Sequence, residues 1–226
     1  MMKRIIWLGQ AGLVFENEFC TVMVDPYLSD SVKDIEPQNY RRVPVDNKMF
    51  EIKPNILVFT HAHLDHYDPE TVKHFLTENS EITVLSPRSV WEKVRLFGGK
   101  NNYILFDAGT ECTVNGIRFT AVKAVHSDPY AIGVLLDDGS KKYYVTGDTL
   151  YNSSIFNSIP KDIYAVFLPV NGVGNNMNMT DAARFVEKID PIYAVPMHIG
   201  MFDNKSPNDF ICDKKVIPEI YKEIQL

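Results

Sequence analysis

Thr60-His61-Ala62-His63-Leu64-Asp65-His66 is a run that holds four potential metal ligands within six positions. It follows Ile56–Thr60, a continuous apolar run of the kind found in strands buried on both faces. It precedes Asp68-Pro69-Glu70, which predicts a helix through about Leu76, because Asp is a favoured N-cap residue and Pro fits the first helical position. The sequence therefore predicts a strand, a ligand-rich turn and a helix in direct succession.

The spacing within this run favours two neighbouring binding points. At a strand end, His61 and His63 can point the same way, while a turn at Leu64 lets Asp65 and His66 face a second point nearby. Imidazole and carboxylate groups suit zinc, iron or manganese, and the run offers no thiolate. A solvent-exposed turn that happens to be rich in His is the alternative, and the strand-turn-helix context argues against it.

Further potential ligands stand at the ends of other predicted strands. They are His126 after Ile117–Val125, Asp148 after Lys142–Thr146 and His198 after Ile192–Pro196. Gly147 lies between its strand and Asp148, where it permits a tight turn. Each of these residues alone is readily explained as structural, but their common position predicts that they join the His61–His66 ligands.

The remaining pattern predicts an α/β fold built as a four-layer αββα sandwich. A helix near Pro87, a helix over Thr180–Ile189 and a terminal helix after Asp213 accompany the strands, and Asp138-Gly139 is typical of a hairpin turn. Each half begins with strands and ends with strand-helix units, which favours two sheets packed face to face with helices outside. We find no linker and expect a single domain over 1–226. Further strand-like runs bounded by turn residues are Arg4–Leu8, Leu13–Glu16, Phe19–Val24, Tyr103–Phe106, Cys112–Val114, Ala131–Asp137 and Tyr164–Leu168.

Composition narrows the class of protein. A net charge of -6 and a pI near 5.5 give no basic field for phosphates, which argues against nucleic acid as a partner. Three separated cysteines suit reduced thiols in a cytoplasmic protein.

The apolar stretch Ile5–Phe15 is interrupted by Gln10 and two glycines and lacks a cleavage site, so we do not interpret it as a signal peptide. No run is long enough for a membrane span, and both a monomer and a homo-oligomer stay open.

The order His-x-His-x-Asp-His, a distant His, Gly-Asp-Thr and a late His resembles the signature of metallo-β-lactamase-fold hydrolases over nearly the full chain. The resemblance implies two divalent ions, Zn²⁺ or Mn²⁺ with iron not excluded, and a small-molecule substrate. The implied ligand assignment is His61, His63 and His126 for the first metal, Asp65, His66 and His198 for the second, and Asp148 as the bridge between them.

A finer resemblance points to the branch of that superfamily typified by L-ascorbate-6-phosphate lactonase. It is carried by Trp7–Gly12, Asp25–Asp30 and Pro196-Met197-His198. It implies hydrolysis of a small ester or lactone, with a phosphosugar lactone among the candidates.

The residues around the expected ligands suggest roles in catalysis. Asp148 and Asp65 are the candidate catalytic residues, because bridged cations lower the pKa of water and Asp65 can orient the resulting hydroxide and carry its proton. Asp25 either accepts an N–H from a ligand imidazole or is a plain turn residue before Pro26.

Other residues suggest roles in binding the substrate. The Asn- and Gly-rich stretch from Asn171 to Met179 either lines the substrate pocket or is a flexible connection. Tyr151 either donates to an oxyanion or packs. Arg41 and Arg42, in the polar segment Ser29–Asn55, could contact an anionic substrate or lie in solvent, and that segment is expected to be a loop that covers something.

Two alternatives stay open on the same ligands. A phosphodiesterase or nuclease would need a basic arm, and the chain has no Lys/Arg-rich insertion. The other alternative is a metal-binding protein without turnover, or a di-iron redox protein with a flavin partner.

Overall fold

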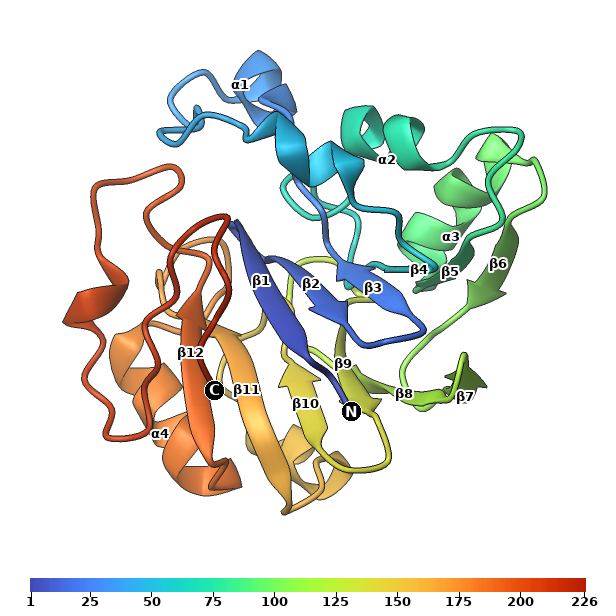
Figure 1. Cartoon of the computed structure of the whole chain (residues 1–226). Coiled ribbons are helices and arrows are strands. Elements are labelled where there is room, and N and C mark those ends of the chain that lie inside the picture. Colours follow the sequence, from blue (N-terminus) through green and yellow to red (C-terminus); the bar gives the residue numbers. More distant parts are fainter.

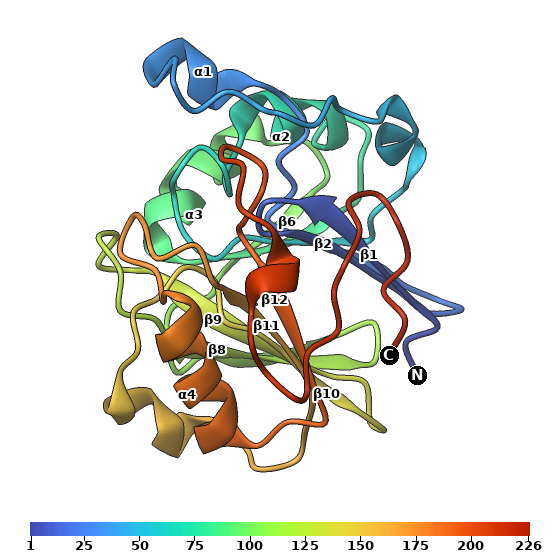
Figure 2. The same cartoon turned by 90° about the vertical axis from the view of Figure 1, so that its left-hand side faces the viewer.

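The protein forms four layers, in which two β-sheets face each other and helices cover the outer face of each (Figure 1). The computed structural model describes residues 1–226. Figure 2 shows α2 (Pro69–Phe75) and α3 (Arg88–Val94) outside one sheet and α4 (Met179–Ile189) outside the other. The αββα sandwich expected from the sequence is confirmed.

The first sheet has the strand order β1-β2-β3-β4-β5-β6. The strands from β1 to β3 pair antiparallel, and those from β3 to β6 pair parallel. The parallel part therefore needs crossover connections, and α2 and α3 lie in two of them. The strands are β1 (Arg4–Gly9), β2 (Gly12–Glu16), β3 (Thr21–Val24), β4 (Ile56–Val58), β5 (Thr83–Ser86) and β6 (Asn102–Leu105).

The second sheet repeats this plan with the order β12-β11-β10-β9-β8-β7. The strands from β7 to β10 pair antiparallel, and β10, β11 and β12 pair parallel. The expected Asp138-Gly139 turn joins β9 to β10. The strands are β7 (Glu111–Val114), β8 (Ile117–Lys123), β9 (Ile132–Asp137), β10 (Lys142–Val145), β11 (Ile163–Pro169) and β12 (Tyr193–Met197).

Capping residues fix the helix ends that the sequence suggested. Asp68 accepts hydrogen bonds from the first turn of α2, and Asn178 accepts one from Asp181 in α4. Asp190 ends α4 in the left-handed conformation. The short helices are α1 (Ser31–Ile35), η1 (Asn47–Glu51), η2 (Arg95–Phe97), η3 (Ser153–Ser158) and η4 (Pro207–Asp209).

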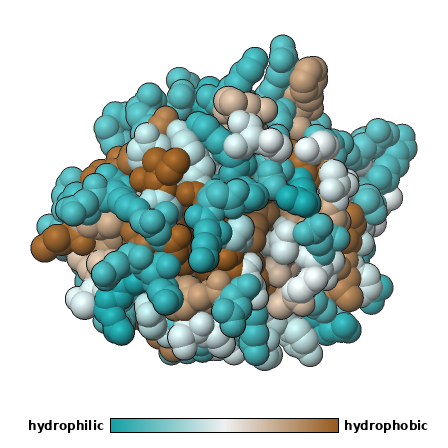
Figure 3. All heavy atoms as spheres, turned by 90° about the horizontal axis from the view of Figure 1, so that it is seen from below, coloured by the Kyte–Doolittle hydropathy of each residue, from teal (hydrophilic) through white to brown (hydrophobic).

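Three hydrophobic clusters fill the spaces between the four layers. The largest, with 26 buried residues, lies between the sheets and includes Phe15, Phe119 and Phe167. A second cluster packs α4 on the second sheet, and a third packs α2 and α3 on the first. Seen from below, the surface is mainly hydrophilic with hydrophobic patches between (Figure 3). None of the helices has the length and apolar content needed to cross a lipid bilayer.

The structure differs from the sequence predictions in three places. The terminal helix expected after Asp213 is wrong, because this segment is extended and bonds to the edge strands of both sheets. Val216 N donates to Ala194 O, and Tyr221 N donates to Trp7 O. Unpaired backbone groups on an edge strand attract such a segment. The sequence predicted no strand at β5. It indicated a loop over Ser29–Asn55, and this segment holds the short helices α1 and η1.

Candidate metal centre

Strands from both sheets end at the same place and deliver the candidate ligands there. In the first sheet β1, β3 and β4 run in one direction, and in the second sheet β8, β10 and β12 do so. The residues that follow these strands are Gln10, Asp25, the 60–66 loop, His126, Asp148 and His198.

The structure brings all seven predicted ligands together. His61, His63 and His126 form one group, here called the imidazole triad, and Asp65, His66 and His198 form another, here called the mixed triad. Within each, the potential ligand atoms lie within 4.8 Å of one another. Asp148 links the two, because it forms a further group with His61 and His66, and its Oδ2 lies 3.1 Å from His198 Nε2. The imidazole triad and the mixed triad contain the residues that the family resemblance assigns to the first and the second metal, and His66 also joins His61 and Asp148 in the third group.

Two buried atoms in this cluster have no hydrogen-bond partner. They are Nε2 of His61 and Oδ1 of Asp148, and both residues are buried; Oδ1 of Asp148 lies 3.3 Å from His66 Nε2 as an ion pair. An unpaired buried polar atom costs free energy, and a native structure usually supplies a partner. A divalent ion is a suitable partner for an imidazole nitrogen and a carboxylate oxygen together. The residues present therefore fit a metal site.

Asp25 lies behind His66 and orients its ring. Its Oδ2 is 2.8 Å from His66 Nδ1 and accepts the hydroxyl of Thr60 at 2.5 Å, while Oδ1 accepts the Thr60 N–H at 2.8 Å. The carboxylate favours the proton on Nδ1, which directs Nε2 of His66 toward the centre. Of the two roles considered from the sequence, the contact with a ligand imidazole is the one that the structure contains.

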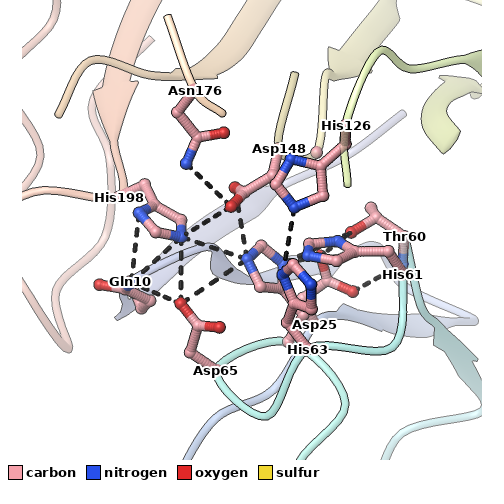
Figure 4. Close-up of polar contacts among 12 residues, drawn as sticks. Gln10, Asp25, Thr60, His61, His63, Asp65, His126, Asp148, Asn176 and His198 are labelled. Atoms are coloured by element: carbon pink, nitrogen blue, oxygen red, sulfur yellow. Dashed lines mark hydrogen bonds and ion pairs between the residues drawn. The ribbon is translucent and has the colours of Figure 1, made fainter. Parts of the chain in front are cut away.

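Gln10 joins the site although sequence reasoning gave it no role. Its side-chain amide donates to Asp65 Oδ2 at 2.7 Å and lies 3.1 Å from His198 Nε2, and its backbone carbonyl accepts the His198 N–H at 3.0 Å (Figure 4). It is buried in the left-handed conformation. The strand-end position that singled out His126 also applies to Gln10, but a neutral amide is not a typical metal ligand.

The Asn-rich stretch contacts ligands of both triads. Asn176 donates to Asp148 Oδ2 at 2.8 Å, and the Asn175 carbonyl lies 3.4 Å from His126 Nδ1. The Asn171 amide nitrogen is 3.1 Å from His198 Nδ1, and its Oδ1 has no partner. Turning that amide over lets Oδ1 accept the Nδ1 proton, which leaves Nε2 of His198 for a metal ion. Asn171 thus contacts a ligand as well as lining the cleft.

A second missed residue fastens the 60–66 loop. Asp128 is buried, and its Oδ2 accepts the Ala62 N–H at 3.0 Å and the Ser89 hydroxyl at 2.6 Å. It follows His126 by two positions. It holds the loop that carries His61 and His63 against the second sheet.

Charge is distributed unequally over the centre. Burial and the neighbouring imidazoles hold the pKa of His61 well below its usual value. Burial also opposes protonation of His198, but the carboxylates of Asp148 and Asp65 outweigh it and raise the pKa of His198 to about 9. The same balance raises the pKa of His66, with Asp148, Asp65 and Asp25 overcoming burial. Without a metal ion, the positive charge of the mixed triad therefore comes from protonated imidazole rings, those of His66 and His198.

A cleft of about 740 Å³ opens beside the centre. Asp65, Asp148 and His198 line it, together with residues of the Asn-rich stretch and of the early segment. The early segment contributes Val32, Ile35, Glu36 and Asn39, so part of the expected covering loop does border the site.

Three residues considered from the sequence lie elsewhere. Tyr151 packs against Phe156 and Phe185 and does not line the cleft, so packing is the role that the structure gives it. Arg41 is buried and donates to the Tyr27 carbonyl, and Arg42 stacks on a tyrosine ring. Neither arginine lines the cleft.

Comparison with known proteins gives one family. The profile of the beta-lactamase superfamily domain matches residues 21–199. A UPF0173 metal-dependent hydrolase from Thermoplasma acidophilum is 28% identical over 243 residues, which cover 99% of this chain and 98% of the relative.

Solved structures share the fold over the whole chain. A protein from Veillonella parvula, described as a possible metal-dependent hydrolase, has a TM-score of 0.81 at 18% identity, with 100% of both chains covered. An isothiocyanate hydrolase from Delia radicum gut bacteria has a TM-score of 0.77 at 18% identity, with 99% of both chains covered. Since the profile spans most of the sequence and includes all seven candidate ligands, the chain belongs to the beta-lactamase superfamily.

Proposed function

We propose that this protein is a metal-dependent hydrolase that uses two divalent ions, Zn²⁺ or Mn²⁺, to cleave a small-molecule ester or lactone. The observation that carries the proposal is the meeting of the two triads around Asp148, with the buried Nε2 of His61 left without a hydrogen-bond partner. The name of the Thermoplasma relative, a metal-dependent hydrolase, supports the same class of reaction.

The cleft supports a small substrate. Its volume of about 740 Å³ falls in the range of small-molecule sites, roughly 300–1,000 Å³. The finer resemblance of Trp7–Gly12 and Pro196-Met197-His198 to the lactonase branch favours an ester or lactone. The isothiocyanate hydrolase shares the fold at 18% identity, so this fold accommodates more than one class of substrate.

The chemistry would divide between the cations and the chain. Divalent ions in the centre would supply a Lewis acid and lower the pKa of a water molecule from about 15.7 toward 7. Asp148 would hold the two triads in one centre, and Asn176 holds its Oδ2 in place. Asp65 borders the cleft, and its Oδ2 is held by Gln10, so this carboxylate is placed to orient the attacking water.

The proposed hydrolysis consumes one water molecule. The water oxygen bonds to the carbonyl carbon, and the bond from that carbon to the leaving oxygen breaks with its electron pair. Asp65 takes the proton from the attacking water and passes it to the leaving oxygen. In this scheme Asp65 is the proton carrier and Asp148 is the structural bridge of the centre.

The test compares metal content and turnover in matched variants. The protein is loaded with Zn²⁺ or Mn²⁺, its metal content is measured by mass spectrometry, and a panel of lactones, esters and phosphodiesters is assayed. We expect Asp148→Ala to abolish turnover and lower metal content, while Asp213→Ala, an exposed site outside the cleft, changes neither. A wild-type protein that holds no divalent ion, or an Asp148→Ala variant with unchanged turnover, overturns the proposal.

A further inference from the structure

Outside the metal centre, the walls of the cleft carry carboxylates but no Lys or Arg side chain. Four carboxylates line it, from Glu36, Asp65, Asp148 and Asp203, and neither Lys nor Arg does. Asp65 and Asp148 belong to the metal centre on the floor. Glu36 and Asp203 line the cleft without belonging to that centre, although Asn39 donates to Glu36, and the backbone N–H groups of Gly200 and Lys205 donate to Asp203.

Two basic side chains, Arg41 and Lys205, are engaged by other groups of the chain. The Arg41 guanidinium donates to the Tyr27 carbonyl at 2.8 Å and to the Tyr221 hydroxyl at 2.6 Å. The Lys205 ammonium donates to the Asn171 carbonyl at 2.8 Å. Anionic groups are usually recognised by free Arg or Lys side chains or by helix N-termini, and the cleft walls offer no such side chain.

The walls also present apolar surface. Ile35, which ends α1, is 69% exposed, and Val173 in the Asn-rich stretch is 56% exposed, yet both line the cleft. Large aliphatic side chains on a surface gain free energy when a ligand covers them. Val32, Leu64, Ile199 and Phe202 extend this apolar lining.

We infer that the cleft takes an uncharged ester or lactone with an apolar side arm and disfavours the phosphorylated counterpart. This inference rests on the proposed function and names the substrate class of the same site. Metal ions held by the centre would attract the oxygen atoms of either substrate, so the walls would decide between side arms. There, a phosphate meets Glu36 and Asp203, whereas an alkyl arm meets Ile35 and Val173.

The first experiment uses two δ-lactones that differ only in whether the side arm ends in a methyl group or a phosphate. We expect kcat/KM of the metal-loaded protein to be at least about tenfold higher for the methyl compound. Glu36→Lys should shift this ratio toward the phosphorylated lactone by about threefold or more, because it replaces a repelling charge with an attracting one. Glu78→Lys, an exposed glutamate outside the cleft, should leave the ratio unchanged.

A binding measurement separates this inference from the proposed function. The two matching δ-lactams resist hydrolysis, so calorimetry reports their affinities without turnover. Tighter binding of the methyl lactam supports the substrate class even if neither lactone is cleaved, an outcome that would count against the hydrolase proposal alone. Tighter binding or faster turnover of the phosphorylated compound overturns the substrate class.

The apolar walls are tested by the double variant Ile35→Ser with Val173→Ser. Both side chains are largely exposed, so folding should tolerate the change. We expect the affinity for the methyl lactam to fall by about threefold or more, with a smaller effect on the phosphorylated lactam. The control is Ile211→Ser, which is 85% exposed and outside the cleft. Equal affinity in the wild type and the double variant would contradict the apolar contact.

Discussion

The imidazole triad and the mixed triad lie on either side of Asp148 but reach their charge state in different ways. Burial is the largest cause that lowers the pKa of both His61 and His126, which favours the neutral form of these two rings. In the mixed triad, carboxylates raise the pKa values of His66 and His198 against the effect of burial. His61 and His126 are thus ready to accept a cation, while His66 and His198 must first release protons.

The two triads also differ in what holds their side chains. Side chains from three strand ends, Asp25, Gln10 and Asn171, contact the mixed triad. In the imidazole triad, the backbone carbonyl of Asn175 lies 3.4 Å from His126 Nδ1. The Ser127 hydroxyl lies 3.4 Å from His63 Nε2, and the Thr60 hydroxyl lies 3.1 Å from His61 Nδ1. Substitutions of the supporting side chains should therefore separate the two triads, whereas a change near Asp148 should affect both.

The largest effect is expected for Gly147→Ala, which would disturb both triads at once. Gly147 has φ +60°, and a Cβ there would lie 2.7 Å from the Ile132 carbonyl and 2.9 Å from Thr60 Cβ. Left-handed strain together with a clash against backbone should lower the free energy of unfolding by about 3 kcal/mol. Urea denaturation of the metal-free protein and metal titration measure the two consequences.

Gly139→Ala is the matched control for this change. Gly139 has φ +83°, but a Cβ there meets nothing within 4 Å, so strain alone should cost about 1 kcal/mol. If Gly147→Ala proves no less stable than Gly139→Ala, the close approach of the two sheets beneath Asp148 is wrong.

A more selective loss is expected for Asp25→Asn. Asparagine tolerates the left-handed conformation at this position, but it turns one acceptor into a donor that faces Thr60 or His66. We expect one metal equivalent to bind about 10- to 100-fold more weakly, while the equivalent at the imidazole triad changes little. Competition with a chelator measures both affinities.

The control for Asp25→Asn is the same change at another buried carboxylate. Asp68 caps α2 and lies outside the centre, so Asp68→Asn should lower stability without changing metal affinity. Equal weakening of both metal equivalents in Asp25→Asn would show that the triads do not act separately.

This contrast also explains how far the sequence could predict the site. The ligands follow from local rules, because His61 to His66 are contiguous and His126, Asp148 and His198 each follow a strand. The strand directions in the two sheets then bring these ends together, as the alternation of strands and helices implied.

The supporting contacts could not be predicted in the same way. Gln10 is 55 positions from Asp65 and 188 from His198, and it acts through an amide that no ligand pattern includes. The sequence singled out Asp25, but a plain turn before Pro26 explained an aspartate at this position equally well. The prediction of a helix after Asp213 was wrong for a related reason. The backbone partners of this segment, Trp7 and Ala194, lie far away in the sequence.

A smaller effect on the mixed triad is expected for Gln10→Ala. The variant removes the N–H that holds Asp65 Oδ2, and it leaves the backbone carbonyl that accepts the His198 N–H. We expect a fall in kcat and in affinity for one metal equivalent of up to about tenfold, with a thermal midpoint close to that of the wild type. Gln10→Asn keeps an amide that is one methylene too short, so it should resemble Gln10→Ala. Full activity in Gln10→Asn would show that the hydrogen bond from the Gln10 amide to Asp65 does not support turnover.

The last expected difference is in the protons that metal binding releases. In the metal-free protein the pKa of His198 is about 9, so at pH 7.5 its ring carries a proton that a cation must displace. Below pH 9 the affinity of the mixed triad should therefore rise about tenfold per pH unit for each proton displaced. The imidazole triad should show little change between pH 7 and 9, because the pKa values of His61 and His126 lie below their usual value. Calorimetry in two buffers of different ionisation enthalpy counts the protons, with His74→Ala as a histidine control outside the centre. Two equivalents with the same pH dependence would show that the triads share one charge state, and the contrast between them would then fail.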